Sequence, residues 1–93
     1  MSDVETTLAE RGARYGDFTD HANIVESVLG VWMDTPGWSK LSADKRQTMR
    51  MIADKTARVL NGDPEYRDNW HDIQGYAKLA EDRCHPAHSG APQ

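Results

Sequence analysis

Two aspartates near the carboxyl end of the chain have the spacing of a metal-binding pair. Asp68 and Asp72 are four residues apart, so on a helix both side chains project from one face, one turn apart. Carboxylates at this spacing can share a divalent cation such as Mg²⁺, which prefers oxygen ligands. In the alternative interpretation, Asp68 lies in the first turn of a helix, where the helix dipole favours a negative charge. Asp72 then accepts a hydrogen bond from Lys55 or Arg58 of the neighbouring helix.

Basic residues of the preceding segment form a candidate phosphate site. Arginine can bind two phosphate oxygens at once and lysine adds a point charge, so Lys55 and Arg58 could hold a phosphate together. Arg58 also follows Asp54 by four residues, a spacing at which a solvated helix forms an ion pair without any ligand.

Asp17 and His21 complete the set of candidate nucleotide-binding residues. They could approach each other across a helix start, and a histidine beside a carboxylate can exchange protons near neutral pH. No Ser or Cys nucleophile is spaced to pair with this histidine. The sequence therefore predicts no catalytic residue and favours a protein that is not an enzyme.

Trp38 is the candidate residue for a protein interface. It lies in a loop between glycine and serine, where it either folds back over the core or is exposed as an anchor for a partner.

The apolar spacing predicts four helices that would position these residues. Ser2 and Glu5 have the pattern of a capping box, Thr19 and Ser42 are expected N-caps, and Gly62 suits a left-handed C-cap. The predicted helices cover about residues 3–15, 20–34, 43–61 and 65–83.

Apolar side chains recur every three or four residues in the last three of these segments and predict the core. The expected core residues are Ile24, Val25, Val28, Leu29 and Trp32, then Met49, Ile52, Ala53, Thr56 and Leu60, then Tyr66, Trp70, Ile73, Ala77 and Ala80. No segment shows the alternation typical of a strand. The sequence predicts an all-α fold, a small antiparallel bundle of about four helices.

The chain of 93 residues has room for one domain, which we expect over residues 1–83, followed by a flexible tail over 84–93 that is poor in large apolar residues.

A net charge of -4 and the lack of a basic run argue against DNA as the main partner. No apolar stretch is long enough for a membrane span, and the amino terminus does not have the pattern of a secretory signal. The single cysteine fits a reducing cytoplasm. Polar helices with spare apolar surface favour a homodimer.

Three ordered blocks resemble a family of small phage and prophage proteins of unknown function. They are ERGARYGDFTDHA (residues 10–22), KTARVLNGDP (55–64) and DNWHDIQGYAKL (68–79). The resemblance implies a helical protein of a phage or prophage that acts in the cytoplasm of the host bacterium.

A looser similarity extends to phage nucleotide-modification-associated domains and to the all-α MazG-type nucleotide pyrophosphatases. Those enzymes hold magnesium with a Glu-x-x-Glu pair on one helix and an acidic pair on the next, and Asp68 and Asp72 match the second pair. The expected first pair is replaced by Thr48 and Met51.

Two functions follow as expectations. In the first, the protein is a phage accessory protein without cofactor or catalysis that binds a bacterial host factor of defence or nucleic-acid metabolism. In the second, it binds a nucleotide, as a sponge or as a magnesium-dependent pyrophosphatase, with Asp68 and Asp72 on the metal and Lys55 and Arg58 on phosphate.

Overall fold

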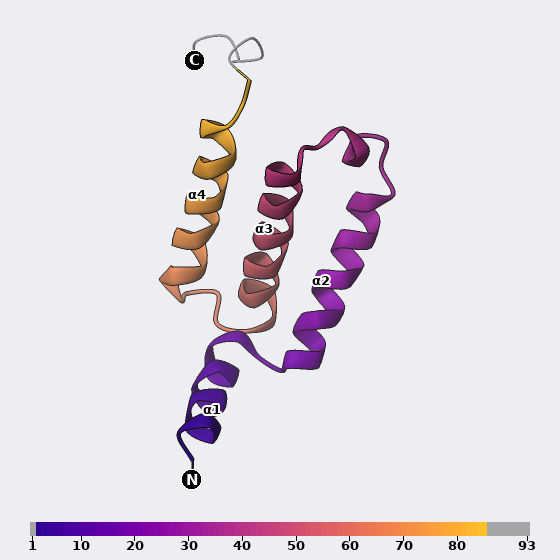
Figure 1. Ribbon diagram of the computed structural model, residues 1–93. Helices are drawn as coiled ribbons and strands as arrows, with labels where there is room; N and C mark the ends of the chain where they lie inside the picture. Colours follow the sequence, from indigo (N-terminus) through magenta and orange to yellow (C-terminus); the bar gives the residue numbers. More distant parts are fainter. Residues whose placement is uncertain (1, 86–93) are drawn as a thin grey trace.

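In the computed structural model, residues 2–85 are described, and this part of the chain contains helices and no strand (Figure 1). The predicted all-α fold is confirmed. None of the described helices is long and apolar enough to cross a membrane. The elements are α1 (Asp3–Tyr15), α2 (Phe18–Met33), the short 3-10 helix η1 (Trp38–Lys40), α3 (Ala43–Asn61) and α4 (Arg67–Asp82). Most of the predicted tail, residues 86–93, lies outside the described residues.

Side-chain caps explain where the first two helices begin. The capping box of α1 is confirmed: the Glu5 backbone N–H donates to Ser2 Oγ (3.1 Å), and the Ser2 backbone N–H donates to Glu5 Oε2 (3.3 Å). Helix α2 begins two residues earlier than expected, because Asp17 and not Thr19 is its N-cap and accepts from the Asp20 backbone N–H at 3.0 Å. A carboxylate at the N-cap accepts a hydrogen bond from a backbone N–H that has no partner within the helix, and its negative charge interacts favourably with the helix dipole.

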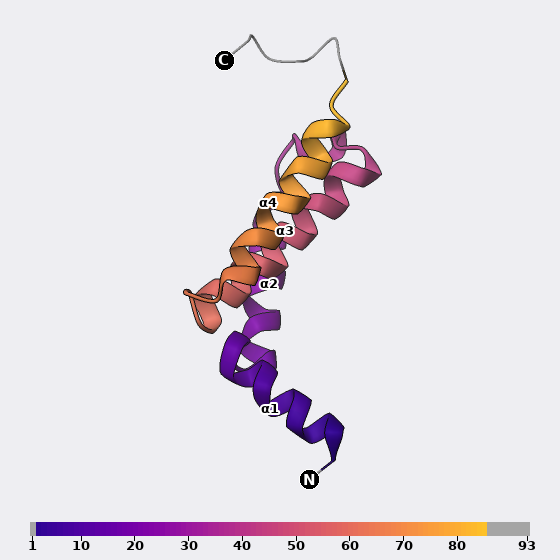
Figure 2. The ribbon, with the colours of Figure 1, turned by 90° about the vertical axis from the view of Figure 1, so that its left-hand side faces the viewer.

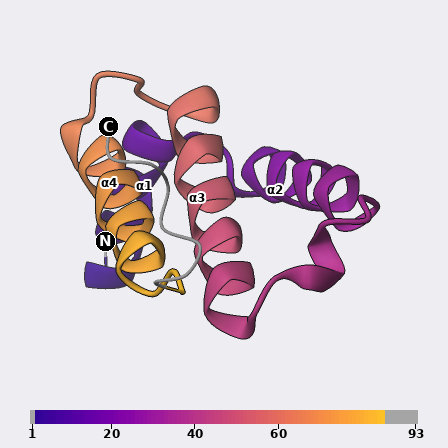
Figure 3. The same ribbon diagram turned by 90° about the horizontal axis from the view of Figure 1, so that it is seen from above.

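Three of the helices form an antiparallel layer with α3 in the middle. Helix α3 packs against α2 on one side and against α4 on the other, and successive helices run in opposite directions (Figures 1 and 3). Helix α1 extends away from this layer, below the end where α2 begins and α3 ends (Figures 1 and 2). The amino-terminal helix therefore adds little to the core and forms a corner with the layer.

The core is thinner than the apolar pattern indicates. Among the described residues the buried apolar side chains are Leu29, Ala53 and Ala57. The predicted core position Trp70 is wrong: its ring is half exposed, and its indole N–H donates to the Pro64 carbonyl at 2.8 Å. The predictions of Thr56, Leu60 and Ala77 as core residues are also wrong, because all three side chains are exposed, Leu60 by 70 %.

The corner is a close contact between two glycine-containing turns. Gly16 has a left-handed φ of 79°, and a Cβ there would lie 2.0 Å from the Asn61 carbonyl oxygen. A Cβ at Gly62 would likewise lie 2.0 Å from the Arg14 carbonyl oxygen. The expected left-handed C-cap at Gly62 is wrong, because its φ is -127°; this glycine is needed for close approach.

Hydrogen bonds from the end of α3 hold the corner together. The Asn61 side-chain amide donates to the carbonyls of Tyr15 (3.0 Å) and Asp17 (2.9 Å), and the Asp63 backbone N–H donates to the Arg14 carbonyl (2.8 Å). These bonds fix where α1 ends, where α2 begins and which way α1 points.

This contact predicts opposite effects for two glycine-to-alanine substitutions. Gly62→Ala should lower the free energy of unfolding by about 1–3 kcal/mol, because the new methyl group overlaps the Arg14 carbonyl. Gly75→Ala, on an open face of α4 with no atom within 4 Å, should raise it by up to about 1 kcal/mol through helix propensity. Urea denaturation of both variants measures the difference, and equal stabilities would contradict the close contact.

Candidate functional site

A pocket of about 540 Å³ occupies the corner between α1, α2 and α3, and we call it the corner pocket. Its volume is within the range of sites that bind small molecules, and most of its wall is apolar. The lining residues are Leu8, Arg11, Gly12 and Tyr15 of α1, Gly16 and Asp17 of the turn, Phe18, His21, Ala22, Val25 and Glu26 of α2, and Asp54 and Arg58 of α3.

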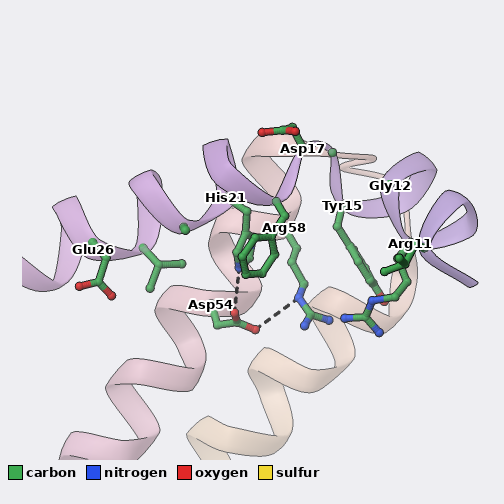
Figure 4. A pocket seen from close by; sticks show the side chains of 13 residues that line it. Arg11, Gly12, Tyr15, Asp17, His21, Glu26, Asp54 and Arg58 are labelled. Carbon is green, nitrogen blue, oxygen red and sulfur yellow. Dashed lines mark hydrogen bonds and ion pairs between the residues drawn. The ribbon is translucent and has the colours of Figure 1, made fainter. Parts of the chain in front are cut away.

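Two arginines from different helices share one aromatic ring of this pocket. The guanidinium carbon of Arg58 lies 4.3 Å from the centroid of the Tyr15 ring, and that of Arg11 lies 5.3 Å from it. Figure 4 shows the two guanidinium groups pointing toward one another beside Tyr15. Both cations are attracted to the same π-system, and this attraction brings two positive charges together.

Asp54 fixes the position of one of these arginines. Its Oδ2 lies 3.3 Å from Arg58 Nε, and its Oδ1 lies 2.9 Å from His21 Nε2, so one carboxylate joins α2 to the pocket face of α3. His21 Nδ1 is buried without a hydrogen-bond partner. A neutral ring with its proton on Nε2, donated to Asp54, leaves only a lone pair unsatisfied at Nδ1. The contact with Asp54 is made by Arg58 Nε, and the guanidinium end of Arg58 lies beside that of Arg11 (Figure 4).

Positive charge is concentrated at the Tyr15 end of the corner. Arg14 lies over the ring of Tyr66 at 5.2 Å, and that ring meets Tyr15 edge-to-face at 6.1 Å. Within the described residues, Arg11 and Arg14 have no ion-pair partner. The acidic pocket residues Asp17 and Glu26 lie away from the Arg11–Arg58 pair (Figure 4). The pocket therefore has a cationic end and an apolar wall, an arrangement suited to a ligand with an anionic group and a ring.

The structure separates Lys55 from Arg58. Lys55 is buried on the other side of α3, where its Nζ lies 3.2 Å from Asp72 Oδ2 of α4. Asp72 thus forms an ion pair with Lys55, one of the two partners that the alternative interpretation expected for it, and the expected Asp54–Arg58 ion pair is confirmed. Of the four residues predicted to bind a nucleotide, Asp17, His21 and Arg58 line the corner pocket and Lys55 does not.

Asp68 and Asp72 have different partners in the structure. Asp68 accepts a hydrogen bond from the Tyr66 hydroxyl at 3.0 Å, and this bond raises the pKa of the Tyr66 phenol. The described residues contain no group of three or more His, Cys, Asp or Glu side chains that could hold a metal ion. The magnesium pair stays a prediction, and Asp72 would have to leave Lys55 to take part in it.

Trp38 lies in η1 at the opposite end of α2 from the corner. It is half-buried, and the Arg50 guanidinium lies over its ring at 5.7 Å. Its expected role in a protein interface stays a prediction.

Sequence reasoning missed Arg11 and Tyr15 as site residues. Both belong to the block ERGARYGDFTDHA. Gly16 and Asp17 in this block indicate a turn between two helices, and this turn was the feature of the sequence that could have pointed to its neighbours Arg11 and Tyr15. Their convergence with Arg58 depends on contacts across more than forty positions of the chain, such as Asn61 with Tyr15, which no local pattern encodes.

These features define a small all-α domain with a cationic corner pocket. The model of a family described as a domain of unknown function (DUF6378) matches residues 2–84, so the chain belongs to that family. No curated protein and no solved structure matches the chain significantly.

The Lys55–Asp72 pair predicts a stability effect that a double variant can reverse. Asp72→Ala should lower the free energy of unfolding by about 1–3 kcal/mol, because it leaves the buried ammonium of Lys55 unpaired. Adding Lys55→Met should restore most of the loss, since an apolar side chain of similar length needs no partner. Thermal or urea denaturation of the single and double variants measures both effects; a double variant no more stable than Asp72→Ala would contradict the assignment.

Proposed function

We propose that the protein binds a nucleotide in the corner pocket without catalysing a reaction on it. The observation that carries this proposal is the convergence of Arg11 and Arg58 on Tyr15. Two guanidinium groups at one end of a mostly apolar pocket favour a phosphate group, which arginine binds with several charge-assisted hydrogen bonds.

The remaining wall favours a ligand that also carries a ring. Leu8 of α1 and Phe18 and Val25 of α2 line the pocket, and Phe18 is 80 % exposed. A nucleobase placed there would cover apolar surface that is otherwise in contact with water. Nucleotides combine such a ring with a phosphate, and the pocket volume is sufficient for this class of ligand.

Preorganisation supports binding at this site. Arg58 is held from one side by Asp54 and from the other by the Tyr15 ring, so it loses little conformational freedom when a phosphate arrives. His21 contributes indirectly, since its ring fixes the Asp54 carboxylate.

Calorimetric titration with a panel of nucleoside phosphates and cyclic dinucleotides tests the proposal. We expect at least one ligand to bind, and at about a hundred times its dissociation constant it should stabilise the fold by about 2.7 kcal/mol. Arg58→Gln should weaken binding by about 10–100-fold, the loss expected for a charge-assisted hydrogen bond. The matched control is Arg50→Gln, which removes an arginine from the same helix that also lies over an aromatic ring, and it should bind normally.

Two results would contradict the proposal. One is a folded wild-type protein that binds no member of the panel; the other is an equal loss of affinity in the Arg58 and Arg50 variants. The ligand should also be recovered unchanged after incubation with Mg²⁺. Release of pyrophosphate would overturn the non-catalytic part and favour the MazG-type alternative.

A second candidate function is that of a phage accessory protein that binds a bacterial protein. It is supported by apolar side chains at the end of α2 that contacts η1: Val31 is 69 % exposed and Met33 is 47 % exposed, near the half-buried Trp38. Exposed apolar groups beside a tryptophan are typical of protein interfaces.

Site-specific photocrosslinking in a bacterial host extract tests this second candidate. A crosslinker at Val31 should capture a defined host protein, and one at the exposed polar residue Glu81 of α4 should not. The same set of captured proteins at both positions would contradict an interface at the end of α2.

A further inference from the structure

Gly12 is a residue of the corner pocket whose type the fold alone does not explain. It lies inside α1, where glycine is less favourable than alanine because it loses more backbone freedom on folding. Its φ is not positive, and no atom lies within 4 Å of the position where its Cβ would be. Gly16 and Gly62 are required by the close contact at the corner, whereas a side chain at Gly12 would meet no atom of the described chain.

The open space beside Gly12 belongs to the corner pocket. Leu8, Arg11, Gly12 and Tyr15 all line this pocket, and the last three follow Leu8 by three, four and seven residues. This spacing places the four residues on one face of a helix. Gly12 lies on α1 between Arg11 and Tyr15 (Figure 4), so a Cβ added to it would project into the pocket.

A backbone without a side chain lets a flat group approach the helix closely. Glycine is the residue that permits such an approach of a ligand to the main chain, because a Cβ would keep the ligand at a greater distance. Helix α2 contributes an exposed ring, Phe18, and a second small residue, Ala22, to the same pocket. Since Gly12 follows Arg11 directly in the chain, one small ligand can place a ring on the Gly12 backbone and an anionic group at the arginines.

The charges of the pocket limit the number of phosphate groups that it can hold. Arg11 and Arg58 are the arginines that line it, and no lysine does. Arg14 lies over another aromatic ring and does not line the pocket, and His21 is already bonded to a carboxylate. One phosphate can be balanced by the two guanidinium groups, but a second or third would meet acidic residues without a further cation. The acidic residues of the pocket are Asp17, Glu26 and Asp54.

We propose that the ligand of the corner pocket is a nucleoside monophosphate and that Gly12 is one of the residues that bind it. The single phosphate lies at Arg11 and Arg58, and the base lies against the backbone of Gly12. This inference rests on the proposed nucleotide binding, for which it names the class of nucleotide and a residue that determines specificity. A side chain at position 12 would occupy the volume that the base takes.

A graded series at Gly12 tests its contact with the ligand. Calorimetric titration with the common ribonucleoside 5′-monophosphates should show several-fold weaker binding for Gly12→Ala and at least about tenfold weaker binding for Gly12→Leu. Both variants should raise the urea midpoint of unfolding, because alanine and leucine favour a helix more than glycine does. The matched control is Gly30→Ala, at an exposed helical glycine of α2 that also has no atom within 4 Å and does not line the pocket. It should raise the midpoint and leave the affinity unchanged.

The outcomes separate this inference from the nucleotide site itself. If the wild type binds a monophosphate and both Gly12 variants bind it with wild-type affinity, the role of Gly12 is overturned and nucleotide binding stands. An equal loss of affinity in Gly30→Ala and Gly12→Ala would overturn the role of Gly12 as well. A folded wild type that binds no nucleotide would overturn nucleotide binding together with this inference.

A comparison of phosphate number tests the ligand class. For one nucleoside, titrated without divalent cations, the monophosphate should bind at least about fivefold more tightly than the triphosphate, because the additional phosphates meet the carboxylates of the pocket. A triphosphate that binds as tightly as the monophosphate, or more tightly, would overturn the single-phosphate class. Arg58→Gln, measured with the same ligands, shows whether binding still occurs in the corner pocket.

Discussion

The close contact of Gly16 with the Asn61 backbone and of Gly62 with the Arg14 backbone is the constraint on which the rest of the structure depends. This contact directs α1 away from the layer and places Tyr15 beside the end of α3. Because of that placement, Arg11 and Arg58 meet on one ring and a pocket opens between three helices. The same geometry leaves Val4 and Leu8 of α1 exposed. The pocket thus depends on a turn that admits no side chain at either glycine.

Polar pairs take over part of the role that a larger core would have. Within residues 2–85 the buried apolar side chains are Leu29, Ala53 and Ala57, and two of these three are alanines. The helices are instead held in register by Lys55 with Asp72 between α3 and α4, and by Asp54 with His21 between α3 and α2. Such pairs add less to stability than apolar contacts of the same size, but they accept few alternative alignments. Asp54 serves in addition to fix Arg58, so one side chain links the packing of the layer to the chemistry of the pocket.

The sequence is sufficient to predict the helices, because the patterns that indicate a helix and its ends lie within a few residues of each other. The capping box at Ser2, the apolar spacing of α2 and the turn after Asn61 each lie within a few residues, and each appears in the structure. The residues of the corner pocket, in contrast, come from three helices and lie far apart in the sequence. Periodicity assigned Trp70 to the core because it cannot show that a single layer of helices leaves a face open. It grouped Lys55 with Arg58, which are neighbours on the helix surface, but in the structure Lys55 pairs with Asp72 of α4 and Arg58 pairs with Asp54 of α3. Asp17 and His21 both line the pocket, where Asp17 caps α2 and His21 reaches across to Asp54, a partner that no local pattern indicates.

The central claim is that Arg11 and Arg58 together bind the phosphate of a nucleotide. The most direct measurement is an NMR titration that follows the Nε–Hε resonances of the arginines while a nucleoside phosphate is added, and then the corresponding nucleoside without phosphate. The account predicts that the resonances of Arg11 and Arg58 shift together with one dissociation constant, that Arg50 does not respond, and that the nucleoside has a much smaller effect. Shifts of equal size at Arg50, or no change at Arg11 and Arg58 while the nucleotide binds elsewhere, would contradict it.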